Sequence, residues 1–205
     1  MATQAQPEFL EATYGSVCRS TRCDEKRRRT LESVVHLAVE LAREGREGRK
    51  IGTLFVIGDV DNVLAQSRSL LLDPLYGHSE DLLHVERPEF RETVKELSQL
   101  DGAFVVKDDG TFVSAGRYVD VEVGAAENFL PGLGTRHAAA ASVSRQTNAI
   151  AVVVSQSSVV RVFANGQVRA EIIPELFLMS KDGLFASRAD VRQVPEAGVT
   201  LAVAD

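Results

Sequence analysis

The sequence predicts one α/β domain in which helices flank a twisted mixed β-sheet, and three observations lead to this prediction. Short apolar segments rich in β-branched residues outnumber the segments with helical periodicity. Helical segments separate several of these strand segments, and a helix crossover joins parallel strands. Asn165-Gly166 stands between two further strand segments and is a strong signal for an antiparallel hairpin. Crossovers and hairpins in one chain therefore indicate a sheet with both parallel and antiparallel pairs.

The composition places the chain among ordinary globular proteins. It has 205 residues, of which 44% are hydrophobic and 25% are charged, so we expect one domain, or one domain with an appendage. The 23 Lys and Arg residues against 29 Asp and Glu residues give a net charge of −6. Broad binding to nucleic acid or to an anionic membrane needs clustered positive charge, which this balance argues against. A small nucleotide held in a local basic pocket remains compatible with it.

We expect a cytoplasmic protein without a membrane partner. No stretch reaches the roughly 18 apolar residues of a membrane helix, and residues 1–10 lack the basic and apolar regions of a secretory signal. Cys18 and Cys23 lie in a polar N-terminal segment, and two cysteines alone supply neither a four-ligand zinc site nor a disulfide framework. They are therefore expected to be reduced thiols.

The first element in chain order is an amphipathic helix. Residues 1–23 are polar and mixed, and we expect them to form a lead-in. The helix opens at Asp24 and is stopped by Gly45 and Gly48. Its apolar stripe recurs with helical spacing and consists of Leu31, Val34, Val35, Ala38, Leu41 and Ala42. The basic run Lys26–Arg29 is either a patch for an anion or partner, or the solvated start of this helix.

The middle of the chain predicts strands around one further helix. The strands are expected at 51–57, 104–107, 111–115 and 118–123. The helix begins at Pro88, because proline suits the first helical turn. Asp109-Gly110 is predicted to form a tight turn between two of the strands. Residues 61–85 are loop-rich, and we assign them no element.

The last third predicts a helix followed by a run of strands. A glycine-bearing loop at 130–134 leads into an alanine-rich helix at 138–145. The strands are expected at 149–155, 159–163 and 167–172. The tail from Pro174 onward is weakly patterned, and we expect it to be an edge element or an interface arm.

Three short constellations carry candidate chemistry, and the first is Gly132–His137. Its glycines allow close backbone approach, and a helix N-terminus suits a phosphate. Thr135 can cap the helix or donate its hydroxyl, Arg136 can make a charge-assisted contact, and His137 can bind phosphate or a metal ion. The same residues also fit a capped helix with a surface Arg and His, since neither a Walker nor a dinucleotide spacing is present.

The other two constellations flank predicted strands. Asp101-Gly102-Ala103 opens a strand, and its carboxylate can hold a divalent cation or accept a proton from a hydroxyl. The two small neighbours leave room for a flat group, although Asp-Gly is also common in turns for conformational reasons. Ser155–Ser158 follows a buried strand at a place where ligands of open α/β sheets usually bind, or it is a polar turn.

Taken together and in order, the constellations resemble the diadenylate cyclase domain, the family that makes cyclic di-AMP from ATP. The resembling segments are LDGAFVV at 100–106, LPGLGTRHAAAAS at 130–142 and TNAIAVVVSQ at 147–156, with a weaker IGTLFVIGD at 51–59. The resemblance covers residues 50–172, so we divide the chain into a helical lead-in at 1–49 and a cyclase-like domain at 50–205. Ala138 departs from the family pattern where many members carry arginine, and Gln156 departs where many carry glutamate.

The resemblance implies a metal-dependent nucleotidyltransferase that condenses two ATP molecules across a face-to-face dimer, with Mn²⁺ or Mg²⁺ as cofactor. Asp101 would bind the metal, or orient and deprotonate the attacking 3′-hydroxyl. Arg136 and His137 would complete the catalytic set, and His137 would also be a metal ligand. Gly102 and Ala103 would line the nucleoside. The groups implied to contact phosphates are Leu133, Gly134, Thr135, Arg136, His137 and Ser155.

Two other functions remain open. A module of the same fold could bind a nucleotide as a sensor or oligomer without turnover, and the departures at Ala138 and Gln156 keep this alternative. A simple ATP hydrolase is the second alternative, in case the face-to-face dimer does not form.

Overall fold

The structure is a computed structural model that describes residues 14–15, 17–19, 21, 23–121, 134–181, 189–194 and 199–204. Its helices are α2 (Glu25–Glu44), α3 (Val60–Ala65), α4 (Pro88–Leu97), α5 (Thr135–Gln146) and α6 (Pro174–Lys181), with a 3₁₀ turn η1 (Glu80–Leu82). Its strands are β1 (Thr53–Ile57), β2 (Ser67–Ser69), β3 (Ala103–Val106), β4 (Phe112–Val119), β5 (Ile150–Val154), β6 (Val160–Ala164), β7 (Gln167–Ile172), β8 (Ala189–Val194) and β9 (Val199–Ala204).

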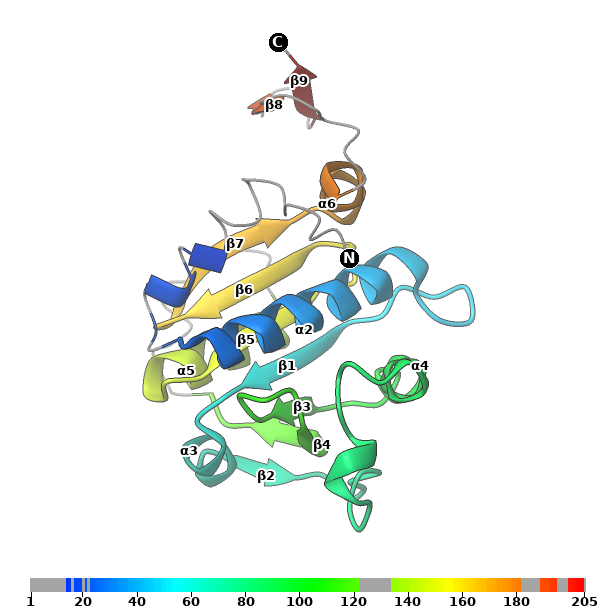
Figure 1. Ribbon diagram of the computed structural model, residues 1–205, viewed down its shortest axis with the longest axis vertical. Coiled ribbons are helices and arrows are strands. Elements are labelled where there is room, and N and C mark those ends of the chain that lie inside the picture. Colours follow the sequence, from blue (N-terminus) through cyan, green and yellow to red (C-terminus); the bar gives the residue numbers. More distant parts are fainter. Residues whose placement is uncertain are drawn as a thin grey trace.

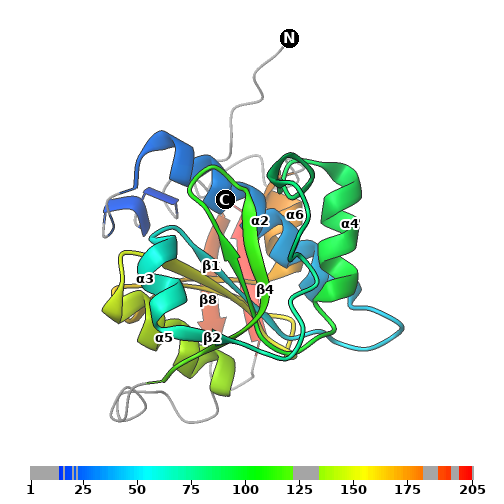
Figure 2. The same cartoon turned by 90° about the horizontal axis from the view of Figure 1, so that it is seen from below.

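Seven of these strands form one mixed sheet in the order β2-β4-β3-β1-β5-β6-β7 (Figure 1). β1 and β3 are parallel, and the other neighbouring pairs are antiparallel. Helices α2, α4 and α6 cover one face of the sheet, and α3 and α5 cover the other (Figure 2). The predicted α/β class with a mixed sheet flanked by helices is confirmed. β8 and β9 pair with each other in a separate two-stranded sheet.

Two apolar cores fill the space between the sheet and its helices. Every residue of β1, β3 and β5 is buried, as expected for central strands covered on both sides. Alternate side chains enter opposite cores: Phe55 belongs to the core under α2, and Leu54 to the core under α5. The apolar stripe of α2 is buried in the first of these cores. The helix that precedes residue 50 therefore shares a core with the strands that follow it.

Several predicted boundaries are confirmed by the local geometry. The side chain of Asp24 accepts a hydrogen bond from the backbone N–H of Arg27 and caps α2, and Gly45 ends that helix with a φ of 62°. Asn165 and Gly166 both have positive φ, as a two-residue hairpin between β6 and β7 requires.

Other predicted boundaries differ from the structure. The strands expected at 111–115 and 118–123 are one strand, β4, because Gly116 adopts a φ of 64° and lets the ladder continue through a register irregularity. Residues 122–123 of that expectation lie outside the described part of the chain. The helix expected from residue 138 begins at Thr135. Residues 61–85, which carried no assignment, hold most of α3 together with β2 and η1.

The expectation of two reduced thiols is wrong in this structure, because Cys18 and Cys23 are joined by a disulfide. Tyr14 and Val17 are buried in the core, which turns this segment back toward the start of α2. The Cα atoms of the two cysteines consequently lie 4.8 Å apart, within the usual range for a disulfide. In the part of the chain that the structure describes, no helix is long and apolar enough to cross a bilayer.

The basic side chains at the start of α2 already form ion pairs with acidic residues of the same chain. Arg27 is buried and donates from Nε to Asp108 Oδ1 at 2.6 Å, and from Nη1 to the carbonyl oxygen of Asn148 at 3.0 Å. It thereby ties α2 to the β3–β4 turn and to the start of β5. Arg29, by contrast, lies on the surface and pairs with Glu25 one turn earlier. One arginine of the run is thus structural, and the run is not a free anion patch.

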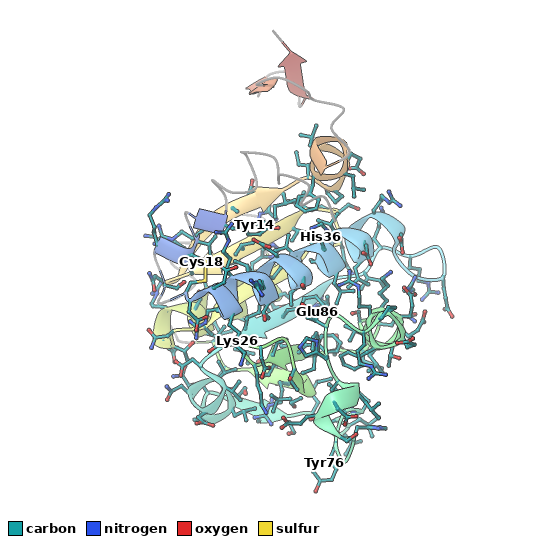
Figure 3. The ribbon with its side chains drawn as sticks, in the orientation of Figure 1. Tyr14, Cys18, Lys26, His36, Tyr76 and Glu86 are labelled. Atoms are coloured by element: carbon teal, nitrogen blue, oxygen red, sulfur yellow. A yellow bond between two sulfur atoms is a disulfide. The ribbon has the colours of Figure 1, made fainter. Side chains whose placement is uncertain are left out.

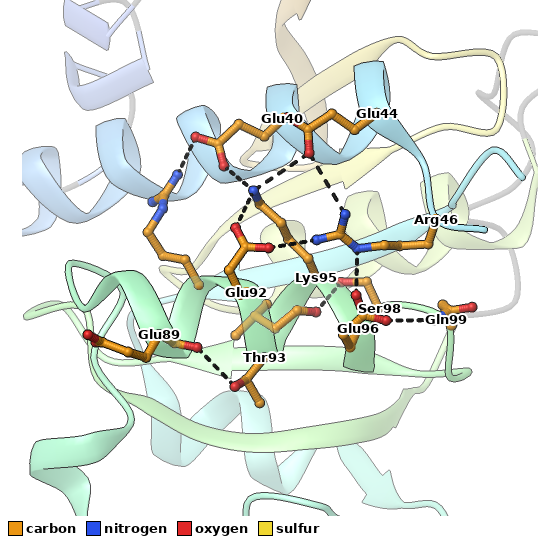
Figure 4. Close-up of polar contacts among 12 residues, drawn as sticks. Glu40, Glu44, Arg46, Glu89, Glu92, Thr93, Lys95, Glu96, Ser98 and Gln99 are labelled. Carbon is orange, nitrogen blue, oxygen red and sulfur yellow. Dashed lines mark hydrogen bonds and ion pairs between the residues drawn. The ribbon is translucent and has the colours of Figure 1, made fainter. Parts of the chain in front are cut away.

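A second polar cluster connects α2 with α4 (Figure 4). The buried Lys95 ammonium lies 2.8 Å from carboxylate oxygens of both Glu40 and Glu92. Arg91 also contacts Glu40 at 2.8 Å, and Arg46 contacts Glu92 at 3.1 Å. Burial alone would raise the pKa of the Glu40 carboxyl, but hydrogen bonds and positive charge from Lys95 and Arg91 hold that pKa below its usual value.

We expect Arg27→Met to destabilise the protein more than Arg29→Met does. Removing the buried Arg27 leaves the Asp108 carboxylate and the carbonyl oxygen of Asn148 without their donor, so the free energy of unfolding should fall by about 2–4 kcal/mol. Arg29→Met removes only an exposed pair and should change it by less than about 0.5 kcal/mol. Urea unfolding of the two variants measures both values. Equal losses would show that the contacts of Arg27 contribute nothing beyond those of a surface pair.

The α2–α4 cluster should make stability depend on pH in the acid range. The folded pKa values of Glu40 and Glu92 are lowered, so their contribution is complete above the unfolded pKa and is lost as pH falls through the folded values. We expect Lys95→Met to flatten the decline of unfolding free energy between about pH 5 and about pH 3. Lys107→Met, which removes the more exposed pair with Glu80, is the control and should leave the decline in place. A Lys95→Met curve parallel to wild type would contradict this assignment.

Candidate functional site

The candidate site lies at one end of three central strands of the sheet, where β1 and β3 begin and β5 ends. Leu54 pairs with Ala103, and Thr53 pairs with Val154. The residues just outside these pairs are therefore neighbours in space, although they lie far apart in the sequence. They include Gly52 before β1, Asp101 before β3 and Ser155 after β5, and we call this place the site edge.

Arg136 reaches across the site edge from the first turn of α5. Its Nη2 lies 3.3 Å from Oδ1 of Asp101, whose side chain is 91% exposed. A Cβ added to Gly52 would lie 3.1 Å from Arg136 Nη1 and 3.3 Å from Cγ of Gln156. Gly52 therefore leaves the space over which the guanidinium extends, with Gln156 beside it. The structure thus brings together Asp101, Arg136 and Gln156, the residue that differs from the glutamate of many family members.

Glycines also fix the backbone that carries Asp101. Gly102 has a φ of 103°, and a Cβ added there would lie 2.6 Å from the carbonyl carbon of Gly116 in β4. Only a glycine can approach β4 this closely in such a conformation. Ala103, the third residue of the motif, is buried in the core under α5. Of the two small residues expected to line a nucleoside, Gly102 is partly exposed and could contact a ligand, whereas Ala103 is buried in the core.

The first turn of α5 presents the predicted phosphate-binding residues. Gly134 is the N-cap residue, with an extended backbone and no side-chain cap, so Thr135 does not cap the helix. Both residues are exposed. N–H groups in the first turn of a helix have no intrahelical acceptor and attract anions. Leu133, which was also expected to contact phosphates, and Gly132 lie outside the described residues.

His137 lies on the inner side of the same turn. It is buried, its ring packs edge-to-face against Phe163, and its Nε2 lies 3.2 Å from Nη1 of Arg161 in β6. Burial, reinforced by the positive charge of Arg161, lowers the pKa of His137 below its usual value. A guanidinium only donates hydrogen bonds, so Nε2 carries no proton in this contact and the imidazole is the neutral form.

The described residues of the site edge do not by themselves fit a resident divalent-cation site. Asp101 offers one carboxylate, whereas hard cations prefer several oxygen ligands. The Nε2 of His137 faces a guanidinium, which repels a cation. In the described ranges no three His, Cys, Asp or Glu side chains come together as a group that could hold a metal ion. The expected metal pair of Asp101 and His137 thus lacks further ligands among these residues.

Ser155 stands at the β5–β6 turn beside the site edge. Its Oγ lies 2.9 Å from Oγ of Ser157 and accepts a hydrogen bond from the backbone N–H of the same residue. Its carbonyl oxygen accepts from the N–H of Ser158, which has a φ of 62°. The serines thus form a local turn network, and Ser155 remains half-buried next to Gln156.

Sequence reasoning did not single out three residues that shape this site. Gly52 and Gly116 create the close approaches around Arg136 and Gly102, and Arg161 is the partner of His137. A glycine that opens an apolar strand is a weak signal for close approach, and it could have indicated Gly52. Nothing in the local pattern around Arg161 points to a residue of α5.

The charges of the site edge suit a phosphorylated ligand with a hydroxyl. The half-buried Arg136 guanidinium and a helix N-terminus converge on one side, and both favour phosphate oxygens. An exposed carboxylate stands opposite and can accept a proton or orient a hydroxyl. The arrangement can therefore hold a nucleotide phosphate next to an attacking hydroxyl group.

Comparison with known proteins gives consistent matches. The family model described as DisA bacterial checkpoint controller nucleotide-binding (DAC) matches residues 40–168. A diadenylate cyclase of Methanocaldococcus jannaschii is 46% identical over 160 residues, which cover 78% of this chain and 50% of that protein. A diadenylate cyclase of Haloferax volcanii is 38% identical over 149 residues, covering 72% of this chain and 54% of that protein. The chain thus spans about half the length of these curated relatives.

A solved structure of a DacA double mutant from Staphylococcus aureus superposes with a TM-score of 0.48 and 22% sequence identity, covering 77% of this chain and 97% of that chain. The family assignment rests on the sequence matches instead. The family model covers more than half of the chain, and it includes Asp101 and Arg136 at the site edge. The chain belongs to the diadenylate cyclase (DAC) domain family.

Proposed function

We propose that this chain is a diadenylate cyclase that condenses two ATP molecules into cyclic di-AMP and releases two pyrophosphates. The observation that carries the proposal is the 3.3 Å contact between Asp101 and Arg136, which joins two motifs of the family at one edge of the sheet. The two curated relatives named diadenylate cyclase support it. The carboxylate can orient the attacking hydroxyl and accept its proton, while the guanidinium beside it can bind the phosphate that is attacked.

The proposed reaction consists of two equivalent phosphoryl transfers. In each, the 3′-oxygen of one ATP forms a bond to the α-phosphorus of the other, and the bond from that phosphorus to the bridging oxygen breaks. Pyrophosphate leaves, and the proton of the hydroxyl passes to Asp101 or to water. Arg136 would turn from Asp101 to the α-phosphate and stabilise the charge that develops there. Positioning and charge stabilisation supply most of the catalysis in such transfers.

The other site residues have supporting roles in this proposal. Gly134 and Thr135 would contact phosphates at the start of α5, together with Leu133. Ser155 would add a hydroxyl from the β5–β6 turn, and Gly102 would lie against the nucleoside. ATP is supplied as its complex with Mg²⁺ or Mn²⁺, so the cation belongs to the substrate.

A second copy of the chain is required, because one site with one ATP cannot supply both hydroxyl and phosphate partners. The product is two-fold symmetric, which an isologous dimer can template. Exposed apolar side chains next to the site edge support this arrangement: Leu71 and Leu72 are 99% and 68% exposed, and the carbonyl oxygen of Leu72 approaches Gly116, the contact of Gly102. Tyr76 of the same loop projects away from the molecule (Figure 3).

The alternative is a module of the same fold that binds a nucleotide without turnover. Gln156 favours it, since this neutral side chain lies beside Arg136 at a position where many family members carry glutamate. One assay separates the functions: the purified chain is incubated with ATP and Mg²⁺ or Mn²⁺, and the products are resolved. Cyclic di-AMP supports the cyclase, and ADP with phosphate supports a hydrolase. Unchanged ATP with measurable binding supports the module without turnover.

We expect Asp101→Asn to keep the fold and to lose cyclisation. The amide cannot accept the hydroxyl proton, so the rate should fall by about 10²–10⁴-fold. The side chain is almost fully exposed, so the melting temperature should change little. Asp61→Asn, an exposed carboxylate on α3 beyond the opposite end of β1, is the control and should retain the rate. Near-normal cyclic di-AMP output from Asp101→Asn would remove Asp101 from the mechanism.

We expect charges on the exposed loop to disrupt the proposed dimer. The double variant Leu71→Glu with Leu72→Glu should weaken self-association about tenfold or more, because a buried apolar contact would gain two unpaired charges. Light scattering coupled to gel filtration measures the assembly, and binding of a non-hydrolysable ATP analogue checks each single site. Val168→Glu, an exposed position on the outermost strand β7, is the control. Unchanged assembly of the loop variant would exclude this loop from the interface.

A further inference from the structure

We propose that Arg161 is a positioning residue of the cyclase: it holds His137 by a hydrogen bond and thereby fixes the first turn of α5, from which Arg136 reaches the substrate. The inference rests on the proposed function for its catalytic consequence. The contact itself is a feature of the fold and can be tested without turnover.

The contact joins three elements of the domain. Arg161 in β6 stands opposite Glu171 in β7, and its Nε donates a hydrogen bond to Oε1 of that carboxylate. Its Nη1 lies 3.2 Å from Nε2 of His137 in α5. Glu171, Arg161 and His137 therefore form a continuous polar chain from the sheet to the helix. The guanidinium is mostly buried, with 16% of its side chain exposed.

The chemistry of the pair decides which atoms carry protons. A guanidinium only donates hydrogen bonds, so Nε2 of His137 must be the acceptor. The proton of the neutral imidazole then resides on Nδ1. Because the lone pair of Nε2 is already used, this nitrogen is not available to a cation unless Arg161 is displaced. In our proposal the partner of His137 is thus an arginine, and the role of metal ligand that the family resemblance implies for His137 is replaced.

The position of His137 explains why this contact affects the site. Consecutive residues of a helix project about 100° apart, so His137 faces inward while its neighbour Arg136 faces the site edge. Fixing one side chain of a turn fixes the orientation of the whole turn. The charge of Arg161 is balanced by Glu171, so the guanidinium can hold His137 without competing with Arg136 for phosphate.

The competing explanation is a buried histidine that serves stability alone. Both explanations predict a lower melting temperature when Arg161 is removed. Only the positioning role predicts a change in the histidine tautomer together with a loss of turnover in folded protein. Only the positioning role predicts that lysine, which can also donate to Nε2, restores part of the activity.

The experiment compares Arg161→Met and Arg161→Lys with a matched control, Arg169→Met. Arg169 is a half-buried arginine on the adjacent strand, and it donates to the carbonyl oxygen of Ala164. Nitrogen-15 NMR of the His137 ring reports the tautomer, with and without Mg²⁺ and a non-hydrolysable ATP analogue. Affinity for the analogue and the kcat and KM for ATP are measured on the same samples below the melting temperature of each variant.

We expect Nδ1 to carry the proton in the wild type, and Mg²⁺ to leave the Nε2 signal in place. Arg161→Met should change the tautomer equilibrium and lower kcat by about 10- to 100-fold, with a smaller effect on analogue affinity. Arg161→Lys should recover part of kcat, and Arg169→Met should match the wild type in kcat and tautomer.

Two results would overturn the proposal. One is a wild-type His137 with its proton on Nε2, or with Nε2 shifted by direct binding of Mg²⁺. The other is a folded Arg161→Met variant with wild-type kcat. If the wild type makes no cyclic di-AMP, the proposed function fails, but the NMR and analogue-binding results still test the contact.

Discussion

The register of β3, β1 and β5 is the constraint on which the rest of the site depends. These strands are buried on both faces, so a slip of one residue would move Phe55 into the core under α5 and Leu54 into the core under α2. The cost of that exchange fixes the pairing of Leu54 with Ala103 and of Thr53 with Val154. The residues just outside these pairs are therefore held together, and a polar site forms where β1 and β3 begin and β5 ends.

Stability and the proposed chemistry are carried by different contacts. The buried Lys95 connects α4 to α2, and the buried Arg27 connects α2 to the sheet; each side chain contacts several polar groups. The Asp101–Arg136 pair is exposed, and such pairs contribute only about 0–1 kcal/mol to folding. A weak pair is well suited to a binding site, since a phosphate can replace the carboxylate as the partner of Arg136 at little cost to the fold.

The first turn of α5 links these two parts of the molecule. His137 connects it to the core through Arg161, and Arg136 extends from it over Gly52. In our proposal the inner contact orients the outer one. The same geometry explains why a cation is better regarded as part of the nucleotide substrate, because the described residues offer it one exposed carboxylate and an imidazole that faces a guanidinium.

Much of the fold could be predicted from the sequence, because local signals decide it. The cap at Asp24, the hairpin at Asn165-Gly166 and the apolar strand segments depend on short-range physics, and the structure agrees with each. Two predictions were wrong where tertiary packing, not local sequence, decides the structure. The two strands expected at 111–123 are one strand, β4, which continues through Gly116. The two thiols expected to be reduced form a disulfide in a segment whose Tyr14 and Val17 are buried in the core.

The sequence by itself determined the motifs, the family and the pairing of Asp101 with the Arg136 segment as one candidate site. Only the tertiary structure decided which side chains meet. Gly116 meets Gly102, Arg161 meets His137, and Gly52 lies against Arg136 and Gln156. All of these partners are distant in the sequence, and no local pattern encodes such contacts. His137 faces the core rather than the site edge for the same reason: helix phase places Arg136 outside, and the packing of α5 on β6 places its neighbour inside.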